Sequence, residues 1–226
     1  MGLPMDIDTI MAKARIPQQG RSRASFERML TTAEELMRQR GSDEFTLNEV
    51  AKHGKVSIGS IYCRFDSKDD LVHVVQLRVL ERVDTEMLAT IGAVQQQGGD
   101  LIDMVHDLVR SIADVLRNYA EVMRPLMLRA SGDPVIASIG KRSYVRTSNA
   151  VIEALLTCRD EIHHPDPRHA ADAGFRILYA SIARYLGFGS SLDAAGEGDW
   201  NELKNDLGDM LAAYLSMAPK GNRQPT

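Results

Sequence analysis

The sequence predicts an all-α protein, with a small N-terminal three-helix domain that contains a helix-turn-helix and a larger C-terminal helical bundle. Apolar residues recur at three- and four-residue spacing through most of the chain, which is the period of an amphipathic helix. Ser, Thr or Asp precedes most of these stretches, and Gly or Pro interrupts them, as is typical of helix ends. The 226 residues suffice for one large or two small domains with a substantial core.

The first strongly periodic stretch covers residues 24–40. Its apolar side chains form a single stripe. Gly41 follows, where a helix end favours a residue in the left-handed conformation. We expect this helix to support the next two helices rather than to form part of a site.

Residues 46–71 are expected to form a short helix, a tight turn, a second short helix and the start of a third. Thr46 and Glu49 have capping-box spacing, Ser57 is an N-cap for the second helix, and Ser67 caps the third. Small residues at the front of the second helix, then a hydroxyl-bearing aromatic and a cation, suit a helix that enters a DNA major groove. This face carries Gly59, Ser60, Tyr62, Cys63 and Arg64.

The turn between the two short helices contains Gly54 followed by Lys55. If Lys55 adopts a positive φ, that conformation costs roughly 1–2 kcal/mol. In the alternative arrangement the turn is shifted by one residue and Gly54 takes the unusual conformation. In both cases Lys55 is available to contact a phosphate.

Residues 23–75 resemble the N-terminal domain of the TetR family of bacterial transcriptional repressors, over about the first third of the chain. The turn departs from the family pattern, which commonly has a small residue followed by Gly. The matching residues are Phe26, Ala33, Leu36, Met37, Gly41, Phe45, Thr46, Val50, Ala51, Val56, Ser57, Gly59, Ser60, Ile61, Tyr62, Phe65, Lys68 and Leu71.

The resemblance implies that the helix-turn-helix binds double-stranded DNA. Thr46, Tyr62 and Lys68 match positions that contact the phosphate backbone in the family. Arg64 stands where the family often has histidine, and we expect it to contact a phosphate or, as the alternative, to read a base. With Lys55 in the turn, these residues form the expected phosphate-binding set.

Three small residues at the front of the second helix are expected to come within reach of base edges. They are Ser57, Gly59 and Ser60. Since specificity depends on a few side chains and on DNA shape, the operator sequence does not follow from them.

Charge is distributed unevenly along the chain, whose net charge is −4. Residues 13–68 contain 11 basic and 7 acidic residues, whereas residues 69–226 contain 16 basic and 22 acidic residues. A basic N-terminal part and an acidic C-terminal part are typical of a DNA-binding domain, here residues 23–70, followed by a domain that does not contact DNA.

Residues 1–22 are expected to form a flexible arm, because their apolar pattern is weak. Arg15, Arg21 and Arg23 would let such an arm reach phosphates or a minor groove. The alternative is a solubilising tail without a role in binding. Residues 219–226 are expected to form a second flexible tail.

Residues 71–218 are expected to form the effector-binding and dimerisation domain, with further helices over about 101–119, 120–130, 134–158, 168–188 and 200–215. The resemblance implies that a small molecule releases the DNA. It also implies a homodimer in which the last two long helices of each chain pair as a four-helix bundle, which suits a palindromic operator.

Eleven methionines supply adaptable apolar lining for an effector pocket, which suggests a mostly apolar effector with one or two polar anchors. Each candidate is equally explained as ordinary core packing. The candidate lining residues are Met87, Met104, His106, Met123, Met127, Tyr144, Phe175 and Tyr179.

The sequence favours a cytoplasmic protein without cofactor or metal. It has no signal peptide, no membrane-spanning run and only two separated cysteines. His163, His164 and His169 lie close in sequence, but Asp166 followed by Pro167 is better explained as a helix start.

Two functions besides an effector-released repressor remain open. One is a DNA-binding regulator of the same fold without an effector. The other is a helical enzyme, which is disfavoured because no phosphate loop, nucleophile elbow or H-E-x-x-H spacing is present.

Overall fold

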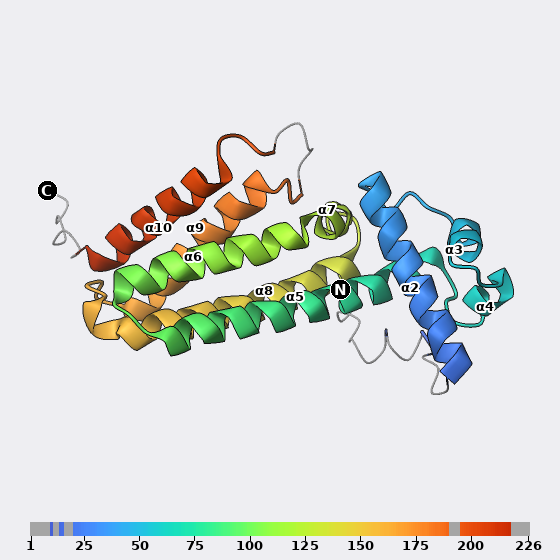
Figure 1. Ribbon diagram of the computed structural model, residues 1–226, viewed down its shortest axis with the longest axis horizontal. Helices are drawn as coiled ribbons and strands as arrows, with labels where there is room; N and C mark the ends of the chain where they lie inside the picture. The colour runs from blue at the N-terminus through green and yellow to red at the C-terminus, as the bar shows by residue number, and fades with distance from the viewer. Residues whose placement is uncertain (1–9, 11–13, 16–19, 190–194, 218–226) are drawn as a thin grey trace, which may run out of the picture. The chain divides into compact units, whose positions relative to one another are not determined.

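The computed structural model describes residue 10 and residues 14–15, 20–189 and 195–217 (Figure 1). Within these residues the chain forms nine α-helices and one 3₁₀ helix and no β-strand, so the predicted all-α fold is confirmed. None of the described helices is both long and apolar enough to cross a membrane.

The chain divides into two compact units, residues 1–82 with 119–143, and residues 83–118 with 144–226. Helices α5 (Lys68–Gln97) and α8 (Pro134–Leu155) each contribute to both units. The predicted boundary between residues 70 and 71 falls near the start of α5 and stays a prediction. The predicted tail, residues 219–226, lies outside the described residues.

The first unit contains α2 (Gly20–Arg40), α3 (Leu47–His53), α4 (Ile58–Tyr62) and α7 (Ala120–Arg129), with the first parts of α5 and α8. Phe26 of α2 stacks on Phe65, with ring centroids 5.6 Å apart and an interplanar angle of 16°. Because Met29, Met37 and Phe65 are fully buried, α2 forms a rigid support for the two short helices.

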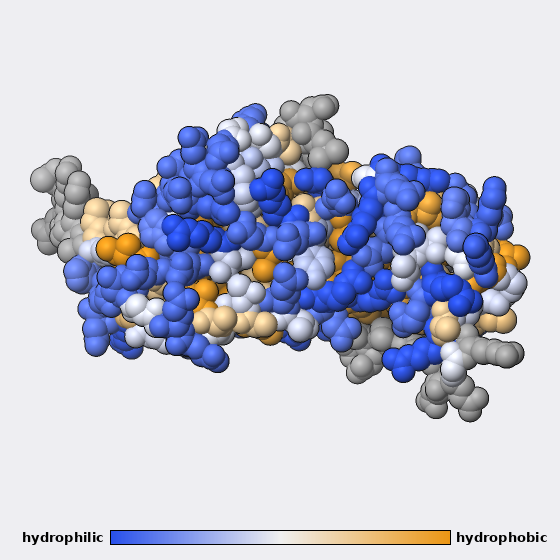
Figure 2. Space-filling view, viewed as in Figure 1, coloured by the Kyte–Doolittle hydropathy of each residue, from blue (hydrophilic) through white to orange (hydrophobic). Residues whose placement is uncertain are grey.

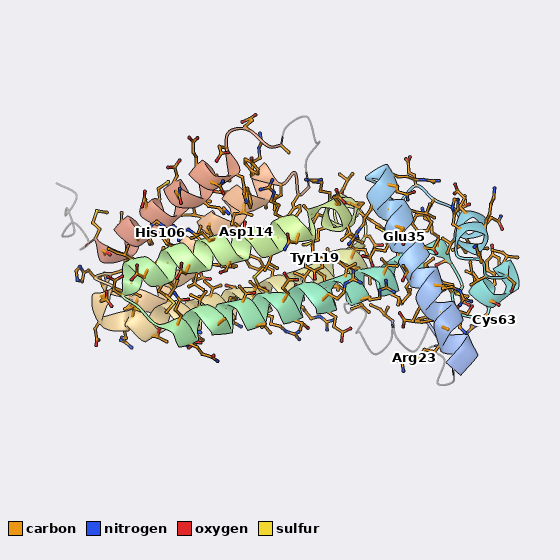
Figure 3. All side chains as sticks on the ribbon, viewed as in Figure 1. Arg23, Glu35, Cys63, His106, Asp114 and Tyr119 are labelled. Carbon is orange, nitrogen blue, oxygen red and sulfur yellow. The ribbon has the colours of Figure 1, made fainter. Side chains whose placement is uncertain are left out.

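The second unit contains α6 (Leu101–Asn118), the 3₁₀ helix η1 (Leu156–Glu161), α9 (Pro167–Tyr185) and α10 (Trp200–Ser216), with the remaining parts of α5 and α8. Helix α10 packs against α6 and α9. A β-carbon added at Gly208 would overlap the ring of His106, so glycine permits the close approach of α10 to α6. Figure 3 shows His106 and Asp114 on the side of α6 that faces α10.

The predicted N-caps of α3, α4 and α9 are confirmed. Thr46 and Ser57 accept the expected backbone N–H bonds at α3 and α4, and Asp199 does so at α10. Asp166 caps α9 with Pro167 at its first position. Two helix ends differ from the prediction. Helix α2 begins at Gly20 rather than near residue 24, and the chain continues from Leu155 as a 3₁₀ helix rather than an α-helix.

Candidate nucleic-acid interface

Helix α3 begins with a complete capping box. The Glu49 N–H donates to Thr46 Oγ1 at 3.2 Å, and the Thr46 N–H and hydroxyl donate to Glu49 Oε2 at 2.8 and 2.9 Å. Arg40, at the end of α2, donates to Glu49 Oε1 at 2.5 Å. The bond from Arg40, followed by those from Thr46, lowers the pKa of Glu49 to about 2. Thr46, a predicted phosphate contact, is therefore an exposed residue whose hydroxyl already serves the cap.

The turn adopts the first of the two predicted alternatives. Lys55 has a φ of 50°, whereas Gly54 has an ordinary helical φ of −76°. Glycine is needed at position 54 for space, because an added β-carbon would lie 2.9 Å from both Thr32 Oγ1 and the Val50 carbonyl oxygen. Lys55 carries the backbone strain, and its side chain is exposed.

Helix α4 presents its small residues outward. The Ser60 N–H donates to the Ser57 hydroxyl at 3.1 Å, and the two hydroxyls lie 2.7 Å apart. Nothing lies within 4 Å of a β-carbon added at Gly59. The Tyr62 side chain is 55% exposed, and the hydroxyl has no hydrogen-bond partner among the described residues. The opposite face holds Ile61, which is fully buried.

Arg64 is engaged by the N-terminal segment. Its guanidinium donates to the Arg15 carbonyl oxygen and to the Ser22 hydroxyl, both at 2.5 Å. Arg15 in turn donates to Asp66 at 3.1 Å and to the carbonyl of Cys63, which Figure 3 labels at the end of α4. Thus Arg64 anchors the segment before α2, a use that the sequence did not indicate.

Ile10 and Ala14 of the predicted arm are buried, and its last residues, 20–22, are helical because they form the start of α2. The remainder of residues 1–19 lies outside the described residues, as does the side chain of Arg21. Arg23 is exposed at the start of α2 (Figure 3).

Lys68 points toward the connection between α2 and α3. Its ammonium donates to the Asp43 carbonyl oxygen at 2.8 Å, lies 3.4 Å from the Asp43 carboxylate, and stands 5.5 Å from the centroid of the Phe45 ring. The Asp43 carboxylate also binds Arg129 of α7. Sequence patterns identified neither Asp43 nor Arg129, since these residues meet Lys68 only in the folded chain.

The candidate effector residues fall in different places. Met123 and Met127 belong to α7 in the first unit, and the other six belong to the second unit. Tyr144, Phe175 and Tyr179 contact one another, with ring centroids 5.0–5.9 Å apart. His106 instead lies against α10, with Nε2 3.2 Å from Asp209. Met87 and Met104 are buried in the core.

An apolar hollow lies between α9 and α10. Ile177 and Met210 are 60% and 64% exposed there. Its lining also includes Gly174, Leu207, Leu211 and Tyr214. Elsewhere, the face of the second unit seen in Figure 2 is mainly hydrophilic, with scattered hydrophobic residues.

His163 and His164, which precede α9, contact backbone atoms, and the ring of His169 lies 5.9 Å from that of His164. His163 Nδ1 lies 2.6 Å from the Ser216 carbonyl oxygen, and the Asp166 N–H donates to His164 Nδ1 at 3.0 Å. Across the described ranges, no group of three or more His, Cys, Asp or Glu side chains is arranged to hold a metal ion. Cys63 and Cys158 are both free.

Comparisons with known proteins agree on one family. Residues 29–75 match the model of the bacterial regulatory proteins of the tetR family. A structure of a protein described as a TetR-family transcriptional regulator from Mesorhizobium loti is similar, with a TM-score of 0.70 and 19% identity over 88% of this chain and 98% of that chain. No curated protein matches the sequence.

Two further solved structures share the fold. The fatty acid degradation regulator FadR from Bacillus halodurans has a TM-score of 0.61 and 17% identity, over 87% of this chain and 97% of that chain. GusR from Salmonella enterica has a TM-score of 0.61 and 19% identity, over 89% of this chain and 100% of that chain.

A capped helix-turn-helix packed on the buried face of a support helix is typical of helix-turn-helix DNA-binding proteins. The match over residues 29–75 assigns the helix-turn-helix domain to the tetR family of bacterial regulatory proteins, as the sequence predicted. This match identifies a DNA-binding transcriptional regulator.

Proposed function

We propose that the chain is a repressor that binds a palindromic operator as a homodimer and releases it when a small, mostly apolar effector binds. The observation that carries the DNA-binding part is the open front of α4, where Gly59 leaves space and Tyr62 is exposed beside it. A helix front without side chains can approach base edges closely, while a flanking phenol hydroxyl reaches a phosphate.

The DNA contacts divide between positioning and reading. Thr46, Lys55, Tyr62 and Lys68 are proposed to contact phosphates, which sets the orientation of α4. Ser57, Gly59 and Ser60 are proposed to face the base edges. Arg64 is proposed to hold the N-terminal segment beside the DNA, because its guanidinium is already occupied by Arg15 and Ser22.

The dimer is proposed to form through the apolar hollow between α9 and α10. Ile177 and Met210 are both large, apolar and mostly exposed, which is costly unless a partner covers them. Two copies that pair these helices have twofold symmetry, so their α4 helices can meet successive major grooves about 34 Å apart.

The effector is proposed to bind beside the ring cluster of Tyr144, Phe175 and Tyr179. Burial raises the pKa of Tyr179 to about 12 and also raises the pKa of Tyr144. Both phenols therefore stay neutral at physiological pH and can donate a hydrogen bond to a polar group of an otherwise apolar ligand.

A regulator of the same fold without an effector is the second candidate. Met87, Met104 and Phe175, three of the candidate lining residues, are almost completely buried in ordinary core packing. An effector screen decides between the two, because release of bound DNA by any small molecule at a saturable concentration excludes this candidate.

Footprinting on the DNA that flanks the coding region tests the operator proposal. We expect two protected half-sites related by a dyad and separated by about one helical turn. Protection without a dyad would contradict binding by a symmetric dimer. The same DNA then serves in the effector screen.

Sedimentation of variants tests the dimer interface. Ile177→Lys or Met210→Lys places a charge in the α9–α10 hollow and is expected to shift the chain to monomer. Ile102→Lys is the matched control, since Ile102 is a similarly exposed apolar residue on α6. A wild-type monomer, or loss of the dimer in the control alone, would contradict the proposed interface.

A further inference from the structure

Arg129, at the C-terminal end of α7, binds three carboxylates of the first unit. It contacts Asp43 of the α2–α3 connection, Asp69 of the first turn of α5 at 2.7 Å, and Asp133 of the α7–α8 turn at 3.1 Å. Its side chain is only 15% exposed. Burial alone would lower the pKa of Arg129, but the bonds to the three carboxylates outweigh burial and raise the pKa above its ordinary value.

One oxygen of Asp43 is shared between two cations. Oδ2 accepts from Arg129 Nη1, and the same atom lies 3.4 Å from Lys68 Nζ. Burial alone would raise the pKa of Asp43, but the interactions with Arg129 and Lys68 together have the larger, opposite effect. The pKa of Asp43 is therefore below its usual range. The carboxylate is therefore ionised at neutral pH, and Arg129 and Lys68 are alternative counter-ions for it.

The two cations differ in how firmly Asp43 holds them. The Arg129 guanidinium is mostly buried and forms a direct charge-assisted bond, whereas the Lys68 side chain is 33% exposed and its ion pair is long. With Arg129 in place, much of the charge of Asp43 is already balanced. Without Arg129, Lys68 becomes the nearest cation to a partly buried carboxylate. Moving Lys68 away would then leave the Asp43 charge without a counter-ion, which is energetically costly.

We infer that Arg129 is a positioning residue for DNA binding: by taking up the charge of Asp43, it leaves the Lys68 ammonium available to a DNA phosphate. This inference rests on the proposed contact between Lys68 and DNA. Arg129 itself needs no contact with DNA, because it acts through the carboxylate that competes with the phosphate for Lys68.

The position of Arg129 makes DNA affinity depend on α7. Asp133, its partner at 3.1 Å, also caps α8 through the N–H groups of Val135 and Ile136 and lies 2.9 Å from His73 Nε2. The end of α7 is thus tied both to the start of α8 and to the first turn of α5. A movement of α7 that withdraws Arg129 from Asp43 strengthens the hold on Lys68 and weakens DNA binding.

Salt-dependent binding of the full chain to a labelled mixed-sequence duplex tests the inference, since phosphate contacts do not require the operator. Each lost phosphate contact lowers the slope of log affinity against log salt by about 0.9, which is about an eightfold loss of affinity near 0.1 M salt. We expect this loss for Lys68→Ala and also for Arg129→Ala. In the Lys68→Ala background, Arg129→Ala should have no further effect on the slope.

Removal of the competing charge should restore binding. Asp43→Asn combined with Arg129→Ala is expected to recover the wild-type slope, because the amide does not hold Lys68 as a carboxylate does. Asp43→Asn alone should bind at least as tightly as wild type. This single variant keeps an acceptor for Arg129, so it provides a test even if Arg129→Ala fails to fold.

Arg168→Ala is the matched control for the loss of one positive charge, because Arg168 forms an exposed ion pair with Glu153 in the second unit. A wild-type slope in folded Arg129→Ala, or weaker binding by Asp43→Asn, would overturn the inference. An unchanged slope in Lys68→Ala would overturn both the inference and the proposed Lys68 contact, while leaving DNA binding by the wild type intact. Failure of the wild type to bind the duplex would overturn the proposed function as well.

Discussion

The α-carbon of Gly54 lies so close to Thr32 that a β-carbon there would be 2.9 Å from the Thr32 hydroxyl oxygen. The same atom would be 2.9 Å from the carbonyl oxygen of Val50. Contacts this short force a movement of α2 or of the turn. The crossing of the helix-turn-helix over its support helix therefore depends on the absence of a side chain at position 54.

Gly54→Ala should destabilise the protein by about 1–3 kcal/mol, as overpacking of a close contact does. Urea unfolding measures the change. Thr32→Ser in the same background keeps the hydroxyl group, so we expect it to rescue less than Thr32→Ala. Full stability in Gly54→Ala would show that the turn does not need the close approach.

Gly59→Ala should separate binding from stability. The added methyl group meets no protein atom, so we expect unchanged stability or a gain of up to about 1 kcal/mol from helix propensity. DNA affinity should nevertheless fall, because the methyl group occupies the space proposed for base edges. Parallel melting and anisotropy titrations measure both effects, and wild-type affinity would place the base-reading surface elsewhere.

Lys55 should reveal its backbone strain through a pair of variants. Lys55→Gly relieves the positive φ, whereas Lys55→Ala retains it, so the glycine variant should be more stable by roughly 1 kcal/mol. Both variants remove the cation and should lower the salt slope of DNA binding equally, by about 0.9. Unequal slopes would mean that backbone geometry, rather than the ammonium, determines the contact.

Glu49 should make stability depend on pH in acid. Its pKa is about 2 in the folded chain and about 4.5 without partners, so its contribution is complete above about 4.5 and is lost as the pH falls toward 2. The difference in unfolding free energy between wild type and Glu49→Gln should be constant near neutrality and shrink over this range. In an Arg40→Ala background the dependence should be smaller, since Arg40 is the largest cause of the low pKa.

Local chemistry explains why much of the fold could be predicted. Thr46 pairs with Glu49, and Ser57 with Ser60, over three residues, so the starts of α3 and α4 follow from short patterns. The turn left two alternatives because backbone preference alone favours glycine at a positive φ. Packing against Thr32 requires the glycine at position 54, and the strain therefore falls on Lys55.

The surroundings of the site could not be predicted in the same way. Lys68 and Asp43 are 25 residues apart, and Arg129 and Asp43 are 86 residues apart. An arginine at the end of a helix is common, and its sequence neighbours give no sign of the carboxylates it will meet. The occupied guanidinium of Arg64 likewise depends on a segment 49 residues earlier.

The central claim, that this regulator binds a specific operator through α4, is tested most directly by fluorescence anisotropy. The wild-type chain would be titrated against DNA flanking its coding region and against a scrambled duplex of equal composition, at several salt concentrations. We predict binding to the flanking DNA at least about 10³-fold tighter than to the scrambled duplex, and loss of that preference in Gly59→Ala. The claim would be contradicted if binding to both duplexes were equal, weak and lost on adding salt, and if selection from random duplexes also gave no sequence that binds more tightly.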